Sequence, residues 1–342
     1  MRAKREHIDD VQPATVDKHF DALINDEETI DYDPSEDLTP TDFPEWYDEK
    51  LFKAGKDYYD SNMVGLTAAS LAGLISVLSI PTILKVLIYT KQSGTSCTAF
   101  KRYFETILHS RAWYMDDATT KGSDWFRSLN VVRWKHMISS RRSFRDGFGG
   151  IMQRDMAYTQ FGFLGYVLIE PEYLGLTNTP EEREGINHFW RVLGHMLGIS
   201  DRLNICRKTE AETTQLCRRL RTEVFAKYFK ELPPNFLHMA EVMVDGLWVI
   251  DTTLNTDTVF AVAYRLNGLT YHKPLSTWSW LNLKYRELIY TLLGSSIFGP
   301  VLRVYFKHLL AFQYWMTLNF PVVAWIRYGK EESKINPYPK FK

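Results

Sequence analysis

The sequence predicts an all-α fold. Helix start and stop signals and apolar residues at helical spacing recur through most of the 342 residues. Alternating apolar and polar residues, which indicate a strand, are scarce, and only residues 259–264 show a weak pattern of this kind. Hydrophobic residues make up 45% of the chain and aromatic residues 14%, which is ample for a large core and for a pocket that takes a flat apolar ligand. We therefore expect a single helical domain.

Charge and cysteine content restrict the class of protein. Lys+Arg 41 balances Asp+Glu 41, so the formal net charge is zero and nucleic acid is not an expected partner. The three cysteines, Cys97, Cys206 and Cys217, form no CxxC motif, and an odd number suits a reducing compartment better than a disulfide framework. Residues 1–10 are charged and lack the apolar region of a signal peptide. We expect an intracellular protein that is not secreted.

Both ends of the chain differ in composition from its middle. Residues 1–60 are acidic and rich in turn formers, which predicts an extended arm with short helical pieces. Phe43, Trp46 and Phe52 are among the side chains that could dock this arm on the body. Residues 61–330 would form the helical domain, and residues 331–342 an irregular tail.

The most apolar stretch covers residues 63–89 and is long enough to span a bilayer. Pro81 would kink it and Lys85 interrupts its second half. Small residues spaced three and four apart between Gly65 and Ser76 would let another helix, or a flat cofactor, approach the backbone. A buried core helix is the favoured interpretation, and a membrane span stays open. A second apolar zone, residues 305–325, is interpreted in the same way.

The remaining helices are predicted from apolar periodicity. They cover residues 98–110, 123–140, 155–169, 210–230, 236–250 and 280–293.

The clearest helix is predicted for residues 179–198. Thr179 and Glu182 have the spacing of a capping box, Pro180 suits the first helical position, and Gly198 suits the C-terminal cap.

This helix carries His188 and His195, seven residues apart and therefore on nearly the same face. The face continues through apolar Val192 and Ile199. The two imidazoles are either core histidines with backbone partners or ligands to something buried.

Common catalytic motifs are missing from the sequence. It contains no GxSxG, no P-loop, no GxGxxG after a strand and no HExxH. The helical body is rich in aromatic residues and has a candidate buried histidine, but no clustered Cys or carboxylate ligands. Among metal sites, this combination favours haem, which needs few protein ligands. One imidazole is enough there, because the porphyrin supplies four nitrogens. The small-residue stripe could then pack against the macrocycle.

Two motifs carry a family resemblance. Residues 153–163 (QRDMAYTQFGF) and 188–199 (HFWRVLGHMLGI) resemble the signature of the latex-clearing protein (rubber oxygenase) and ER-bound mpaB-type oxygenase family. The likeness covers roughly residues 65–303. It implies an all-α body of globin-like packing that holds haem b, and oxidative cleavage of an isoprenoid carbon–carbon double bond with dioxygen. It also implies association with the endoplasmic reticulum membrane.

The resemblance assigns roles to individual residues. His188 matches the proximal haem ligand, with His195 as the alternative metal ligand. Thr159 and Arg154 match catalytic residues that also contact the cofactor, although the spacing of Arg154 differs by one. His136, which together with Arg133 also resembles the family, could interact with the cofactor or be a core residue.

The substrate stays open, because Tyr158 stands where the rubber-cleaving branch has lysine. We expect a hydrophobic, isoprenoid or lipid-like small molecule together with O2. Two alternatives remain: a non-catalytic, membrane-associated scaffold that has lost the cofactor, and an integral membrane protein with spans at 63–89 and 305–325.

Overall fold

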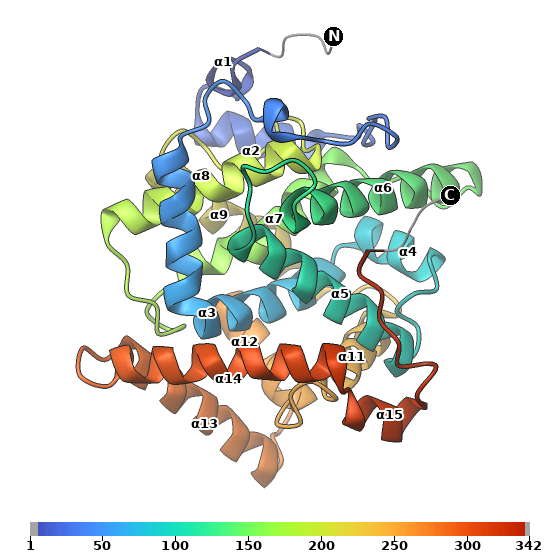
Figure 1. Cartoon of the computed structure of the whole chain (residues 1–342), viewed down its shortest axis with the longest axis vertical. Coiled ribbons are helices and arrows are strands. Elements are labelled where there is room, and N and C mark those ends of the chain that lie inside the picture. Colours follow the sequence, from blue (N-terminus) through green and yellow to red (C-terminus); the bar gives the residue numbers. More distant parts are fainter. Residues whose placement is uncertain (1–5, 339–342) are drawn as a thin grey trace.

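The computed structural model describes residues 6–338 and is all-α over that range, which confirms the predicted fold class. Helix α3 packs most extensively on α8 and α7, and Figure 1 shows α13, α14 and α15 together at one end of the helical body. In chain order the helices are α1 (Ile8–Val11), α2 (Val16–Asn25), η1 (Pro40–Asp42), α3 (Glu49–Leu78), α4 (Pro81–Tyr89), α5 (Ser96–Met115), α6 (Asp124–Arg145), α7 (Gln153–Ile169), α8 (Pro180–Leu197), α9 (Glu210–Arg219), η2 (Leu220–Phe225), α10 (Ala226–Lys230), α11 (Phe236–Leu247), α12 (Thr256–Leu266), α13 (Thr277–Gly294), α14 (Gly299–Asn319) and α15 (Val322–Tyr328).

The apolar stretch at 63–89 is broken at Pro81, as predicted, into α3 and α4. Helix α3 packs on α7, α8, α12 and α14, so it is a core helix of this fold. The small residues of α3 meet protein backbone: a methyl group added at Gly73 would lie 1.7 Å from the carbonyl oxygen of Gly162 in α7. At Gly73 the stripe therefore serves a close helix crossing, whereas Ala68 and Ala72 of the same stripe line a cavity.

The N-terminal segment lies against the helical body. Phe20 and Leu23 of α2 are buried in the main core, and Thr29 forms an antiparallel bridge with Met152, just before α7. Residues 49–60, which the sequence analysis placed in the arm, form the first turns of α3. Residues 331–338 contain no helix, and residues 339–342 lie outside the described range.

Helix α8 has the predicted ends. Thr179 Oγ1 accepts a hydrogen bond from the Glu182 N–H, and the Glu182 carboxylate accepts one from the Thr179 N–H, which completes the capping box. Gly198 takes the left-handed conformation with φ of 91°. The two ends fix the register of the helix and hence the directions in which its histidines point.

Two local predictions are corrected by the structure. Residues 259–264 are helical, in α12, because Asn255 caps the helix and the buried Val259, Val262 and Leu266 follow helical spacing. The zone at 305–325 is not one core helix. It is divided between α14 and α15, which meet at a 46° bend, and one face of α14 is exposed.

Candidate functional site

Two cavities adjoin each other in the helical body. The larger, of about 310 Å³, lies among α3, α5, α13 and α14, and the smaller, of about 250 Å³, lies among α5, α6, α7 and α8. Four side chains line both cavities and form their shared wall: Leu74, Tyr103, Thr106 and Phe163. A molecule in one cavity would therefore lie next to the contents of the other.

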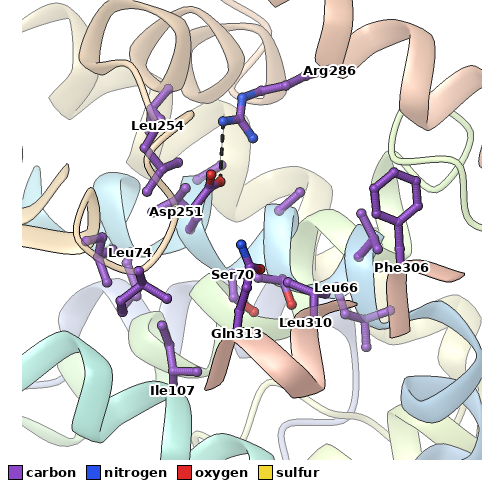
Figure 2. A pocket seen from close by; sticks show the side chains of 18 of the residues that line it. Leu66, Ser70, Leu74, Ile107, Asp251, Leu254, Arg286, Phe306, Leu310 and Gln313 are labelled. Atoms are coloured by element: carbon purple, nitrogen blue, oxygen red, sulfur yellow. Dashed lines mark ion pairs between the residues drawn. The ribbon is translucent and has the colours of Figure 1, made fainter. Parts of the chain in front are cut away.

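The larger cavity is mainly apolar. Figure 2 shows Leu66, Leu74 and Leu310 lining it, with Asp251 and Arg286 at one side. The nearest oxygen and nitrogen atoms of Asp251 and Arg286 are 3.6 Å apart. Such a surface suits a hydrophobic ligand with few polar groups.

Titratable side chains gather instead around the smaller cavity. His109 comes from α5, His136 from α6, and both Asp155 and Thr159 from α7. Asp155 and Thr159 are one helical turn apart, so they reach the cavity from the same face of α7. The Thr159 hydroxyl donates to the Asp155 carbonyl oxygen at 2.8 Å, which orients its lone pairs.

Three buried atoms of ionisable side chains at this cavity have no hydrogen-bond partner among residues 6–338: Nδ1 of His136, Nε2 of His109 and Oδ2 of Asp155. The Tyr103 hydroxyl and Nε1 of Trp113, which also line the cavity, have no such partner either. The other nitrogen of the His109 ring is bonded to Ser128 at 2.9 Å, and Oδ1 of Asp155 accepts from the Thr82 hydroxyl at 2.8 Å. Buried polar atoms are nearly always partnered in folded proteins. The three atoms therefore indicate a site for a polar or metal-containing group.

Burial determines the protonation of these groups. It lowers the pKa of His136 to about 4 and that of His109 to about 3, with smaller contributions from nearby cations. Burial also raises the pKa of Asp155 to about 6, although the bond from Thr82 opposes this shift. At neutral pH both imidazoles are therefore uncharged and have the form that binds metals.

Two cations line the same cavity. Arg102 donates to the Thr90 hydroxyl at 3.0 Å, and Lys135 forms an ion pair with Glu105 at 2.8 Å. Guanidinium and ammonium groups at a cavity wall can bind a carboxylate of a ligand.

The predicted site residues are separated by the fold. Thr159 and His136 line the smaller cavity together. Arg154 does not line either cavity; its guanidinium donates to the Ile24 carbonyl oxygen of α2 at 3.3 Å.

His188 and His195 face the N-terminal segment. Nε2 of His188 accepts a hydrogen bond from the Asp48 N–H at 3.0 Å, and Nδ1 of His195 lies 2.7 Å from Oδ1 of Asp201. The ring of Trp46 meets both imidazoles edge-on, with centroid distances of 6.0 and 5.6 Å. His188 thus has the backbone partner of a core histidine. Its pKa is lowered to about 4 by burial, while Asp48 opposes the shift.

Helix geometry explains why His188 misses the cavity. Trp190 and Gly194 of α8 line the cavity, and His188 lies two residues before Trp190. Residues two apart point to nearly opposite sides of a helix.

Haem needs an unprotonated imidazole for its iron and cations for its propionates. The smaller cavity offers the unpartnered Nδ1 of His136, together with Arg102 and Lys135, so its donor set fits the group. His188 would fit only after the Asp48 N–H leaves Nε2. Among the described residues, no cluster of three or more His, Cys, Asp or Glu side chains could hold a metal ion alone.

Asp155 and His109 were missed from the sequence. Asp155 lies four residues before Thr159, a spacing that already places it on the same helix face. His109 gave no local signal, because only the packing of α5 against α6 brings it to the cavity.

Comparisons with known proteins agree with this architecture. The profile of the family described as "ER-bound oxygenase mpaB/B'/Rubber oxygenase, catalytic domain" matches residues 57–305. The solved structure of latex clearing protein in the closed state is similar, with a TM-score of 0.57 and 16% identity over 81% of this chain and 76% of that chain. This structural likeness shows a shared fold. The search of curated proteins finds no match.

The matched segment extends from the first turns of α3 into the first turns of α14 and includes every residue that lines the smaller cavity. The α14 residues that line the larger cavity, from Phe306 to Tyr314, follow it directly. The chain belongs to the mpaB and rubber oxygenase catalytic-domain family, an oxygenase family.

Proposed function

We propose that this protein is a haem b-dependent oxygenase that oxidises a hydrophobic, isoprenoid or lipid-like substrate with O2. One observation carries the proposal. Neutral imidazoles with unpartnered nitrogens line a cavity that shares a wall with a larger apolar cavity. In a member of an oxygenase family, this arrangement suits a redox group in one chamber and its substrate in the other.

The residues of the smaller cavity would hold the haem. His136 is the first candidate for the iron ligand, because its Nδ1 has no hydrogen-bond partner among the described residues. Arg102 and Lys135 could pair with the propionates. His188, the ligand implied by the family resemblance, is the alternative, followed by His195. Arg154 could reach a propionate only if it left the Ile24 carbonyl.

Bound haem would supply the binding and activation of dioxygen. The protein's own residues would bind the substrate, exclude water and orient polar groups. The apolar cavity would bind the substrate chain and exclude water from the shared wall. Asp155 would hold a proton on Oδ2 up to about pH 6, because Oδ1 already accepts from Thr82. Thr159 would orient polar groups in the cavity with its lone pairs.

The proposal includes the cellular setting. The family description names an ER-bound oxygenase, and a substrate of this class partitions into lipid. These points support the proposal that the protein acts inside the cell, at the endoplasmic reticulum membrane.

Oxygen consumption tests the proposed activity. Haem-loaded protein is mixed with squalene in detergent micelles, oxygen uptake is recorded, and carbonyl products are sought by mass spectrometry with ¹⁸O2. Leu74→Trp, at the shared wall, should lower kcat/KM roughly tenfold because it obstructs contact between the two cavities. Leu237→Trp, at an exposed position of α11, is the matched control and should retain the wild-type rate. Absence of oxygen uptake with isoprenoid substrates would refute the catalytic proposal.

A second candidate is a scaffold that has lost its cofactor. The position of His188, held by the Asp48 N–H outside both cavities, favours it. A scaffold would take up no haem when expressed with excess haem.

A further inference from the structure

The largest exposed apolar surface lies on α13, α14, α15 and the links between them. Of the 22 large hydrophobic side chains that are exposed among residues 6–338, 16 fall between residues 278 and 326. Figure 1 shows these three helices together at one end of the molecule, and α13 and α14 pack on each other. We call the exposed side of these helices the C-terminal platform. Patches of this extent usually bind a partner.

The exposed residues follow helical periodicity. On α14, Val301, Tyr305, Phe312 and Trp315 recur at spacings that place them on one face. Phe312 and Trp315 are 57% and 52% exposed. The opposite face packs on α3 in the core. Helix α14 is therefore apolar on its protein side and on its solvent side, as expected of a helix that also contacts lipid.

Helix α13 has a matching stripe. Trp278, Leu281, Tyr285 and Leu288 are three or four residues apart, and Trp278 is 64% exposed. Trp and Tyr are enriched where proteins meet the membrane–water interface. Four of the ten tryptophans of the chain fall within residues 277–330.

Charge favours an anionic lipid surface over a second copy of the chain. Residues 277–330 contain six Lys and Arg residues and one acidic residue, Glu287. Three of these cations pair with aspartates outside the segment: Arg286 with Asp251, Lys307 with Asp60, and Arg327 with Asp245. Lys284 pairs with Glu287, so the remaining cations are Arg303, on the inner face of α14, and Lys330. The platform therefore carries a small positive excess over a large apolar area, which an anionic bilayer would attract.

The shape indicates binding in the membrane plane and not across it. Helices α14 and α15 together are long and apolar enough to span a bilayer, but they meet at an angle of 46°. The inner face of α14 is held by the body: Arg303 donates to the Gly175 carbonyl oxygen at 3.1 Å. A helix that packs on protein along one side and exposes apolar side chains along the other is typical of an interfacial anchor.

We propose that the C-terminal platform docks in the interfacial region of an anionic lipid bilayer, with α13, α14 and α15 lying in its plane. Tyr285, which is 51% exposed on the platform, also lines the larger cavity, as does Phe306 of α14. The platform is thus continuous with the wall of that cavity. An apolar ligand could pass from lipid into the cavity without crossing water. Only this last step rests on the proposed function.

Vesicle flotation with the full-length protein tests the docking. The vesicles contain phosphatidylcholine alone or with about 30% phosphatidylserine. The wild type should float with the mixed vesicles, and alkaline carbonate should release it. The double variant Trp278→Glu/Trp315→Glu should bind roughly tenfold more weakly, because two carboxylates would enter the interface. The matched control is Phe144→Glu, since Phe144 is 67% exposed on α6, outside the platform.

Circular dichroism and thermal melting establish that each variant is folded, and Tyr305→Glu replaces the double variant if that protein does not fold. The docking proposal fails if wild-type protein floats with neither vesicle, or if Phe144→Glu loses as much binding as the double variant. If alkaline carbonate did not release the protein from the vesicles, the platform would span the bilayer, and in-plane docking would be wrong. A dimer in light scattering that the double variant dissociates, without vesicle binding, would assign the platform to a second copy. Flotation is measured with and without haem, so its failure leaves the oxygenase proposal untouched.

Discussion

At the residue scale, the chemistry of the smaller cavity depends on groups whose protonation is shifted by burial. His136 and His109 hold unprotonated nitrogens at neutral pH, and Asp155 keeps its proton to about pH 6. Lys135 lowers the pKa of both histidines further by repelling a second positive charge, and Arg102 does the same for His136. The cavity is therefore suited to a group that brings its own charge or metal.

Replacing Asp155 with Asn should stabilise the protein above pH 6. The folded carboxyl has a raised pKa of about 6, against 3.8 for its ordinary value, so the folded state loses stability as pH rises from about 4 to 6. Asn cannot ionise and avoids this loss. Urea unfolding should show Asp155→Asn about 3 kcal/mol more stable than wild type at pH 8, and nearly equal to it at pH 4. An equal difference at both pH values would contradict the assigned ionisation.

Some of this site could be predicted from the sequence. The helix face shared by His188 and His195 is real, since both rings contact Trp46. Thr159 and His136 were singled out and line the same cavity. The partner of His188 could not be predicted, because Asp48 lies 140 residues away and only folding brings its N–H to the imidazole.

At the element scale, the closest packing joins α3 to α7. Gly73 faces Gly162 across this crossing, and no flexible side chain separates the two backbones. The spacing of small residues predicted a close approach by another helix or a flat cofactor. The choice between them depended on tertiary packing, which a single sequence does not reveal.

Substituting Gly73 with Ala should destabilise the fold severely. The new methyl group would lie 1.7 Å from the Gly162 carbonyl oxygen, so α3 and α7 would have to separate. We expect a loss of at least about 3 kcal/mol in urea unfolding, or failure to fold. Gly94→Ala is the control, because a methyl group there meets nothing within 4 Å. Wild-type stability in Gly73→Ala would show that the crossing is looser than described.

Helix ends were easier to predict than helix surroundings. The capping box and terminal glycine of α8 occur as predicted, because these signals act over three or four residues. The zone at 305–325 was assigned to the core from its apolar composition alone. Composition cannot distinguish burial in protein from exposure on an apolar platform, and the alternation of buried Tyr314 with exposed Trp315 appears only in three dimensions.

At the scale of the whole molecule, buried histidines make stability depend on pH. The pKa values of His19 and His109 are lowered to about 3, and those of His136 and His188 to about 4, mainly by burial. The unfolded chain takes up protons on these side chains near pH 6.5, whereas the folded chain does not. Their contribution to stability is therefore present above pH 6.5 and is lost as pH falls.

The free energy of unfolding should accordingly fall steeply as the pH is lowered. Near pH 5 the unfolded chain binds one more proton than the folded chain at each of the four histidines, and one fewer at Asp155. The unfolded chain therefore binds about three more protons than the folded chain. This predicts a loss of about 4 kcal/mol per pH unit in the free energy of unfolding. Denaturant titrations between pH 4 and 7 measure the slope, and a flat profile would contradict the burial of these imidazoles.

The central claim is that the smaller cavity holds haem, and an absorption spectrum tests it most directly. Protein expressed with sufficient haem is examined oxidised and dithionite-reduced, beside His136→Ala and His188→Ala. We predict a Soret band that shifts on reduction in the wild type and is lost or altered in His136→Ala. Alteration in His188→Ala alone would assign the iron to the histidine implied by the family resemblance and require the Asp48 contact to open. A colourless wild type would contradict haem binding altogether.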